Sequence, residues 1–207
     1  MSEYHKIETL YERDEKTHRL KPELVLKNPV YGIIKTWVFT EKIDGTNIRC
    51  IWRNEARSLT FGGKTDNANI PANLVNWLRE NITADRMSSV FPDTDVVLYG
   101  EGYGAGIQKG GDLSATQKFI LFDVLVGGKW WLSDENMRDV AAKLGIEAVP
   151  FFGELALEQA TKYVRSGFVS QLNGGKAQAE GLVGRPTEAL FDKKGARLII
   201  KLKTKDF

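Results

Sequence analysis

Apolar and polar residues alternate along Val38–Trp52, and this pattern predicts two strands around a turn. From Ile48 to Trp52 every second residue is apolar, as in a strand with one buried face. Asp44-Gly45 is a turn signal that separates this run from the apolar run before it. We therefore expect a hairpin or a bent strand here.

The remaining apolar positions predict three helices and four more strands. Pro71 opens one helix, Ser133 caps a second that ends at Gly145, and a third covers Leu155–Val164. The strands are short, rich in β-branched or aromatic residues and bounded by glycine: Val96–Gly100, Lys118–Val126, Ala179–Gly184 and Arg197–Lys203. Because strands and helices alternate without a strict β-α-β rhythm, we expect a single α+β domain over residues 1–207, built on antiparallel β-sheets flanked by helices.

Composition narrows the function classes only slightly. The 29 basic and 27 acidic residues leave a net charge of +2, so charge by itself does not indicate a nucleic-acid partner. The single cysteine excludes an internal disulfide and a multi-thiolate metal site. The first ten residues contain no apolar signal-peptide core, and no apolar run approaches about 18 residues. We expect a cytoplasmic protein without a membrane partner.

The first candidate site is Lys42-Ile43-Asp44-Gly45. On an extended strand, Lys42 and Asp44 share a face while Ile43 points into the core, and Gly45 lets the backbone approach a ligand. A lysine amine, with a pKa near roughly 10, becomes a useful nucleophile only where its surroundings favour the neutral form. Nearby cations do this, and Lys201-Leu202-Lys203 places two lysines on one face of a strand.

The glycine-rich run Gly100–Gly106 resembles a dinucleotide-binding loop, but its context differs. A dinucleotide fingerprint opens an apolar helix, whereas this run continues into polar Gln108 and Lys109. Glu101 could instead accept hydrogen bonds from a ribose or hold a metal-bound water. Taken alone, Glu101 is more often a solvated loop carboxylate than a ligand contact.

Two further carboxylates lie in or beside strands. Asp123 interrupts a nearly continuous apolar run, so it is either bonded to backbone donors or a lysine, or it works in a site where Phe122 offers its ring to a base. Glu180 precedes a strand and is unremarkable by itself. The Lys201 and Lys203 pair alone most often marks an exposed basic face.

Together these strings resemble the covalent nucleotidyltransferase superfamily of ligases and capping enzymes, and most closely the type 2 branch of ATP-dependent RNA ligases. The resemblance rests on five strings in order: Glu41–Asn47, Gly100-Glu101 with Gly106–Lys109, Phe122-Asp123, Glu180-Gly181 and Lys201–Lys203. It implies an adenylyltransferase fold with ATP between the sheets.

The resemblance also implies a role for each residue. Lys42 would attack ATP and carry AMP, which passes to an RNA 5′-phosphate that is then sealed to a 3′-hydroxyl. Mg²⁺, or Mn²⁺, would assist with Glu180 as its protein contact. The expected catalytic residues are Lys42, Asp44, Glu101, Glu180, Lys201 and Lys203; the expected nucleotide-binding residues are Glu41, Ile43, Asn47, Lys64, Phe122 and Val183. Phe122 would stack on adenine, Glu101 would bind ribose, and Asn47 would support sealing.

The sequence departs from the family pattern in three places. Asp44 stands where type 2 RNA ligases usually carry histidine, and Lys64 replaces an arginine that grips phosphate in two places. The chain ends four residues after Lys203, so we expect no C-terminal accessory or OB-fold domain. Either this is a minimal catalytic domain or a partner protein supplies the nucleic-acid clamp. A DNA nick ligase, a capping guanylyltransferase and a nucleotide- or RNA-binding module remain open as alternatives.

Overall fold

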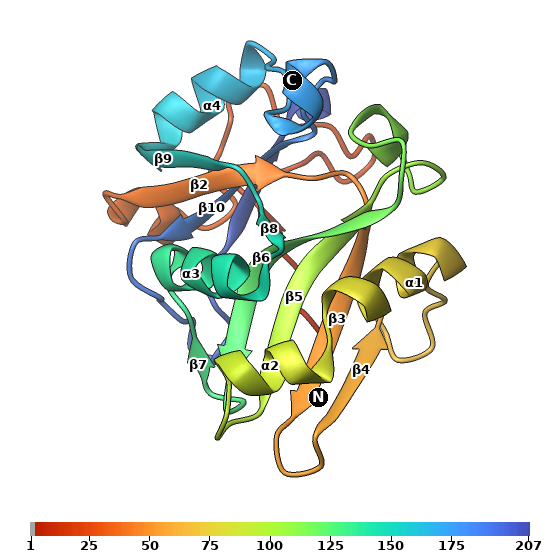
Figure 1. Ribbon diagram of the computed structural model, residues 1–207. Helices are drawn as coiled ribbons and strands as arrows, with labels where there is room; N and C mark the ends of the chain where they lie inside the picture. The colour runs from red at the N-terminus through yellow and green to blue at the C-terminus, as the bar shows by residue number, and fades with distance from the viewer. Residues whose placement is uncertain (1–2) are drawn as a thin grey trace. The chain divides into compact units, whose positions relative to one another are not determined.

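The chain forms two β-sheets, each with its own hydrophobic core, in a computed structural model that describes residues 3–207 (Figure 1). One compact unit contains the start of the chain to Tyr4 together with Asp44–Val149. The other contains His5–Ile43 and Pro150–Phe207. The chain therefore passes from one unit to the other directly after Ile43, within the Lys42–Gly45 segment. The mixed α+β class with antiparallel-rich sheets agrees with the prediction.

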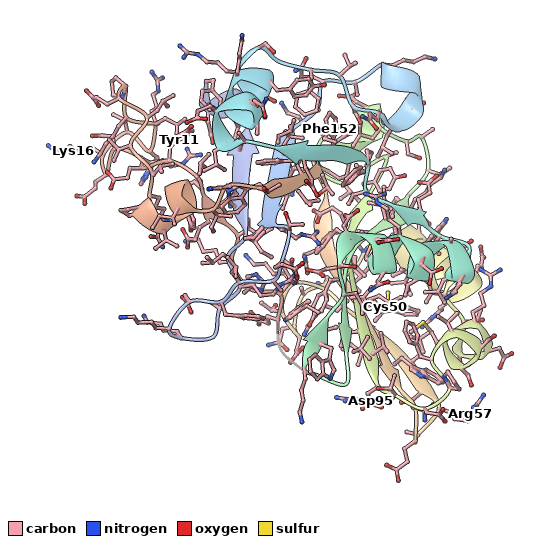
Figure 2. The ribbon with its side chains drawn as sticks, turned by 90° about the vertical axis from the view of Figure 1, so that its left-hand side faces the viewer. Tyr11, Lys16, Cys50, Arg57, Asp95 and Phe152 are labelled. Atoms are coloured by element: carbon pink, nitrogen blue, oxygen red, sulfur yellow. The ribbon has the colours of Figure 1, made fainter. Side chains whose placement is uncertain are left out.

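The first unit is a sheet with helices on one face. Its strands run in the order β4-β3-β5-β6-β7, and β8 pairs with β6 in parallel. The strands are β3 (Thr46–Arg53), β4 (Ser58–Gly62), β5 (Val96–Tyr103), β6 (Lys118–Val126), β7 (Trp130–Trp131) and β8 (Glu147–Ala148). Helices α1 (Ala72–Asn81), α2 (Ala84–Val90) and α3 (Asp134–Leu144), drawn in front of the sheet in Figure 1, cover one face. Cys50 is fully buried beneath them, as its place in the alternating run predicts (Figure 2).

Local signals account for two of these helices. Ser133 caps α3 by accepting a hydrogen bond from the backbone amide of Asn136, and Gly145 ends it with φ of 69°. Helix α1 begins directly after Pro71, as predicted. Helix α2 was not predicted from the sequence, because seven residues around the buried Met87 are too few to show a helical period.

The second unit is a five-stranded sheet in the order β1-β11-β10-β2-β9. Its elements are β1 (Glu8–Thr9), β2 (Trp37–Lys42), β9 (Phe151–Leu155), α4 (Leu157–Arg165), β10 (Gly181–Pro186) and β11 (Ile200–Lys203). Short 3-10 turns lie at Pro29–Ile33, Leu172–Gly175 and Thr204–Asp206, and another lies at Gly110–Asp112 in the first unit. Helix α4 packs on this sheet through Ala160 and Val164. The core also includes Tyr11, and Phe152 packs against it (Figure 2).

The expected hairpin about Asp44-Gly45 is wrong, although both of its strands exist. Strand β2 pairs with β9 and β10, whereas β3 pairs with β4 and β5. Gly45 is needed for a different reason, because a Cβ there would lie 2.2 Å from the carbonyl oxygen of Gly102 on β5. Alternation predicts a strand but not the strand that pairs with it.

Across the described part of the chain, no helix has the length and apolar character needed to span a membrane.

Candidate functional site

In the second unit, Lys42 and Lys203 lie on either side of Gly181 in neighbouring strands. Gly181 of β10 is the register partner of Lys42 on β2 and of Lys203 on β11. Directly paired residues project from the same face of a sheet. Because Gly181 has no side chain, the backbone of β11 can pack closely against it: a Cβ there would lie 1.9 Å from the carbonyl oxygen of Leu202.

The carboxylate of Glu180 joins these two lysines. Lys42 Nζ donates to Glu180 Oε2 at 2.5 Å, and Lys203 Nζ lies 2.7 Å from Glu180 Oε1. The three side chains are only 14–21% exposed. The backbone carbonyl of Glu180 also accepts a hydrogen bond from Thr204, which ties the residue to the end of β11. The arrangement is a lysine-carboxylate-lysine cluster on one face of the sheet.

Lys201 and Val183 extend this face by one row. Val183 on β10 pairs with Lys201 on β11 and with Thr40 on β2. Lys201 lies two residues before Lys203 on β11, and Thr40 lies two residues before Lys42 on β2. Burial lowers the pKa of Lys201 below its ordinary value, and the positive charges of Lys203 and Lys42 act in the same direction. The face thus carries three lysines and one carboxylate, and this excess of positive charge favours an anion.

Burial by itself would raise the pKa of Glu180, but the charges and hydrogen bonds of Lys42 and Lys203 outweigh it and hold the pKa below its usual range. A lowered carboxyl pKa contributes stability above its unfolded-state value and loses that contribution as pH falls through the folded-state value. We expect Glu180→Gln to lower the free energy of unfolding at pH 7 by about 1–2 kcal/mol, discounted for partial exposure. Urea unfolding should show the difference narrowing as pH falls below about 4.5.

Glu188→Gln is the matched control, since Glu188 is an exposed carboxylate of the same unit. The unfolding free energy of Glu188→Gln should remain within about 0.5 kcal/mol of the wild-type value at pH 7 and at about pH 3. A Glu180→Gln difference that is the same at pH 7 and pH 3 would contradict the electrostatic explanation.

Glu41 and Ile43 point away from the lysine face. Glu41 is 2% exposed, and its carboxylate accepts a hydrogen bond from the backbone amide of Gln171 at 2.9 Å. Burial raises the pKa of Glu41, and hydrogen bonds from Ser170 and Gln171 offset part of this effect. Ile43 is 4% exposed. Only the backbone of these two residues is available on the side where Lys42 projects.

In the first unit, the face opposite the helices brings together several of the residues picked out from the sequence. Asn47 pairs with Glu101, and Glu101 pairs with Ile120. Tyr99, two residues before Glu101 on β5, pairs with Asp123. The side-chain oxygen of Asn47 is buried and has no hydrogen-bond partner among residues 3–207. Buried polar atoms are rarely left unsatisfied, so this oxygen is a candidate ligand contact.

A β-bulge brings Phe122 and Asp123 to the same aromatic side chain. On β5, Tyr99 pairs with Asp123 of β6, and the next residue, Gly100, pairs with Leu121. Phe122 therefore has no partner on β5 and is the extra residue of the bulge. The Tyr4 hydroxyl donates to Asp123 at 2.7 Å, and the Tyr4 ring lies 5.0 Å from the Phe122 ring at 70°. The backbone amide of Val124 also donates to Asp123. The partners of this buried acid therefore include a hydroxyl and a backbone amide.

Asp44 and Lys64 lie at the ends of strands in the same unit. Asp44 is partly exposed just before β3, and Lys64 is exposed just after β4. Arg49 holds the segment that carries Lys64, because its guanidinium donates to the carbonyl of Gly63 at 2.8 Å and to Asp66 at 2.7 Å. Arg49 is 1% exposed, and its hydrogen bonds to Gly63 and Asp66 anchor this segment to the sheet.

A single carboxylate, Glu180, is the predicted protein contact for a divalent cation. Among residues 3–207, no three His, Cys, Asp or Glu side chains lie close enough together to hold a metal ion. Glu180 is a single carboxylate facing two lysines. Mg²⁺ commonly uses one or two carboxylates and takes its remaining ligands from water and substrate phosphates. One carboxylate therefore fits phosphate-bound Mg²⁺ or Mn²⁺.

Sequence reasoning missed Tyr4, which contacts Phe122, Asp123, Tyr99 and Trp131. No local signal could have found it, since Tyr4 is one aromatic residue in a polar stretch, 119 positions from Asp123. It also missed the anchoring role of Arg49, because alternation places Arg49 on the polar face of its strand and gives no sign that this position is buried.

A sequence model of the RNA ligase family matches residues 35–203. No curated protein matches the chain in sequence. Among solved structures, it is similar to a variant of Naegleria gruberi RNA ligase with ATP and Mn, at 18% identity and a TM-score of 0.68 over 98% of this chain and 62% of that one.

Two other structures of the Naegleria gruberi protein are similar to the same extent. The RNA ligase with PPi matches at 17% identity and a TM-score of 0.66, over 98% of this chain and 62% of that one. A variant with AMP and Mn matches at 17% identity and 0.66, over 97% and 60%. At identities this low, the structural likeness shows a shared fold and nothing more. The chain spans about three fifths of the length of these structures.

Proposed function

The chain belongs to the RNA ligase family, and we propose that it is an ATP-dependent RNA ligase that carries AMP on Lys42. The observation that supports this proposal best is the lysine-carboxylate-lysine cluster, in which a lysine at the end of β2 lies beside further cations. Such a lysine needs neighbours that favour its neutral form and neutralise its target. ATP and Mn accompany the Naegleria gruberi protein in one similar structure, which agrees with the proposed co-substrates.

In the first step, Lys42 Nζ attacks the α-phosphorus of ATP. An N–P bond forms, the bond from that phosphorus to the oxygen shared with the β-phosphate breaks, and pyrophosphate leaves with the oxygen. The Lys42 ammonium must first transfer a proton to water and give up its contact with Glu180, so that the lone pair of the amine can attack. Glu180 therefore holds the resting lysine in place, and nucleotide binding breaks the contact.

Charge accumulates on the phosphates during this step, and the second unit supplies opposite charge. Lys201 and Lys203 neutralise the α-phosphate oxygens, because both lie on the face of Lys42. A divalent cation, Mg²⁺ or Mn²⁺, would be held by ATP phosphates and by water that Glu180 binds. When bound, it would neutralise phosphate charge and orient the leaving pyrophosphate.

The family pattern assigns the rest of the nucleotide to other residues. Phe122 stacks on adenine and Glu101 hydrogen-bonds the ribose. Val183 contacts the nucleotide from the lysine face. Glu41 and Ile43 contribute backbone groups, since their side chains are buried in the opposite direction.

The second and third steps act on RNA ends. AMP passes from Lys42 to an RNA 5′-phosphate, which forms a P–O–P bond as the N–P bond breaks. A 3′-hydroxyl then attacks the activated phosphate and releases AMP. We assign the 5′-phosphate to Lys64 and the sealing step to Asp44 and Asn47, whose buried side-chain oxygen is unsatisfied among the described residues. A partner protein could supply a nucleic-acid clamp for these steps.

The experiment is intact-mass measurement after incubation with ATP or with GTP in the presence of Mg²⁺ or Mn²⁺. We expect a gain of one AMP from ATP only, followed by sealing of 5′-phosphorylated RNA ends in preference to DNA nicks. A GMP adduct would indicate a capping enzyme, and preferential sealing of DNA would indicate a DNA nick ligase. AMP transfer without sealing would leave a self-adenylylating domain that needs its partner. No mass change with either nucleotide would contradict the proposal.

A further inference from the structure

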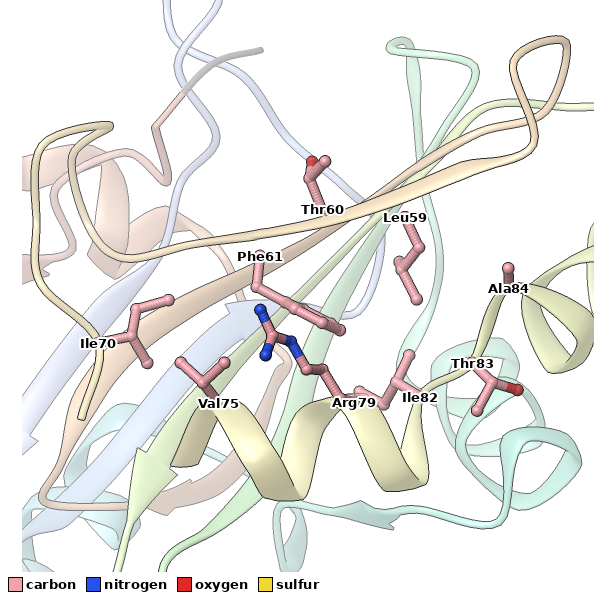
Figure 3. Close-up of a pocket in the computed structure, with 9 residues that line it drawn as sticks. All are labelled: Leu59, Thr60, Phe61, Ile70, Val75, Arg79, Ile82, Thr83 and Ala84. Carbon is pink, nitrogen blue, oxygen red and sulfur yellow. The ribbon is translucent and has the colours of Figure 1, made fainter. Parts of the chain in front are cut away.

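A groove of about 540 Å³ lies between β4 and α1 of the first unit (Figure 3). Its walls are mainly aliphatic and aromatic. Phe61 contributes from β4, Ile70 from the segment before α1, and Val75 and Ile82 from one side of α1 and its end. The volume falls in the range of pockets that bind small molecules or single nucleotides.

The groove carries one charged side chain, and that side chain is a cation. Arg79 is the only ionisable residue among those that line it. In Figure 3 the Arg79 guanidinium and the Phe61 ring point into the same space from opposite sides. Arg79 is exposed and forms no ion pair within residues 3–207. An aromatic face beside a guanidinium is suited to a stacked base and its phosphate.

The groove is also continuous along the chain with the segment that carries Lys64. Phe61 lies on the edge strand β4, and Lys64 follows the end of this strand by two residues. Arg49 holds this segment against the sheet through Gly63 and Asp66. The groove is on the helix-covered face of the sheet, because Phe61 pairs with the buried Cys50. An RNA strand whose 5′-phosphate contacts Lys64 would pass around the β4 edge of the sheet to reach it. An apolar peptide would leave Arg79 without a counter-charge, whereas a nucleotide phosphate supplies one.

We infer that this groove binds a nucleotide of the RNA strand, with its base stacked on Phe61 and its phosphate paired with Arg79. The inference rests on the proposed function, because it takes RNA to be the substrate. It places a strand contact several nucleotides from the reacting end, where it adds affinity without entering the chemistry.

The test measures fluorescence anisotropy of a labelled, 5′-phosphorylated, single-stranded 12-nucleotide RNA over a range of salt concentrations. Arg79→Gln removes the charge from an exposed position, and Phe61→Leu removes the ring while keeping apolar volume. Arg57→Gln is the matched control, since Arg57 is an exposed arginine at the β3–β4 turn of the same unit (Figure 2). Thermal unfolding midpoints establish that each variant is folded.

We expect Phe61→Leu to weaken RNA binding by about 5- to 100-fold, the effect of losing one stacked base. Arg79→Gln should lower the salt slope of the binding constant by about 0.7, the value for one phosphate contact on a single strand. Arg57→Gln should bind as the wild type does. The inference is overturned if neither the wild type nor any variant binds the RNA detectably, or if all of them bind it equally. It is also overturned if Arg57→Gln weakens binding as much as Phe61→Leu and Arg79→Gln do.

Wild-type formation of lysyl-AMP, measured separately by intact mass, distinguishes this inference from the proposed function. An adduct together with unchanged binding in Phe61→Leu and Arg79→Gln overturns the groove alone. Absence of the adduct contradicts the proposed function, while the anisotropy results still decide whether the groove binds RNA.

Discussion

Lys42→Ala eliminates the AMP adduct, and we expect the rate of its formation to fall by about 10⁴-fold or more, the scale on which losing a covalent nucleophile acts. No other described lysine on this face has the same place, since Lys201 and Lys203 are on β11 and Lys42 ends β2. The measurement is intact mass after incubation with ATP, followed by peptide mapping of any adduct.

Lys42→Arg and Lys205→Ala separate chemistry from folding. Arginine keeps a cation beside Glu180 but is not a useful nucleophile, so this variant should be folded and form no adduct. Lys205 is an exposed lysine of the same unit, and its removal should leave adduct formation at the wild-type rate. An AMP adduct in Lys42→Ala, mapped to another lysine, would show that the nucleophile is wrongly assigned.

Gly181→Ala should destabilise the second unit by about 4 kcal/mol or more. A Cβ at this position would lie 1.9 Å from the carbonyl oxygen of Leu202 and 2.8 Å from the Cα of Lys203. Both contacts are with backbone, so no side-chain rotation relieves them. The φ angle of 153° adds strain for any residue with a Cβ. The strand that separates Lys42 from Lys203 must then move, and adduct formation should be lost with the fold.

Urea unfolding of Gly181→Ala beside Gly111→Ala tests this expectation. A Cβ at Gly111 would meet only the Cα of Ala105 at 3.7 Å, an ordinary contact, so its unfolding free energy should change by no more than about 0.5 kcal/mol. A Gly181→Ala protein with the wild-type unfolding midpoint would refute the steric argument. Adduct formation by such a protein would also show that the spacing of the lysine-carboxylate-lysine cluster tolerates change.

Much of the secondary structure follows from local patterns. The strand at Lys118–Val126 has the predicted bounds, and the predicted strand beginning at Val96 is confirmed but extends to Tyr103. The helices after Pro71 and Ser133 are confirmed by their first residues and, for the second, by its cap. Strand β4 was not anticipated, because its five residues lack clean alternation between buried and exposed positions.

The candidate site was predictable only as separate pieces. Alternation places Lys201 and Lys203 on one face of a strand, and the structure has them there. It could not show that Glu180 lies between Lys42 and Lys203, because that depends on β10 pairing with both β2 and β11. The roles of these residues in nucleotide transfer stay predictions, to be decided by the adduct experiments.

The sequence by itself determined the strand and helix types, the placement of alternating side chains on opposite faces and, through five ordered strings, a likeness to nucleotide-transferring ligases. Only the tertiary structure decided that β2, which ends at Lys42, and β3, which begins two residues after Asp44, belong to different sheets, that a bulge presents Phe122 with Asp123, and that Tyr4 contacts both. The physical reason is range. Side-chain periodicity is set by neighbouring φ and ψ angles, whereas strand partners and bulges depend on which distant segments bury each other's apolar surface.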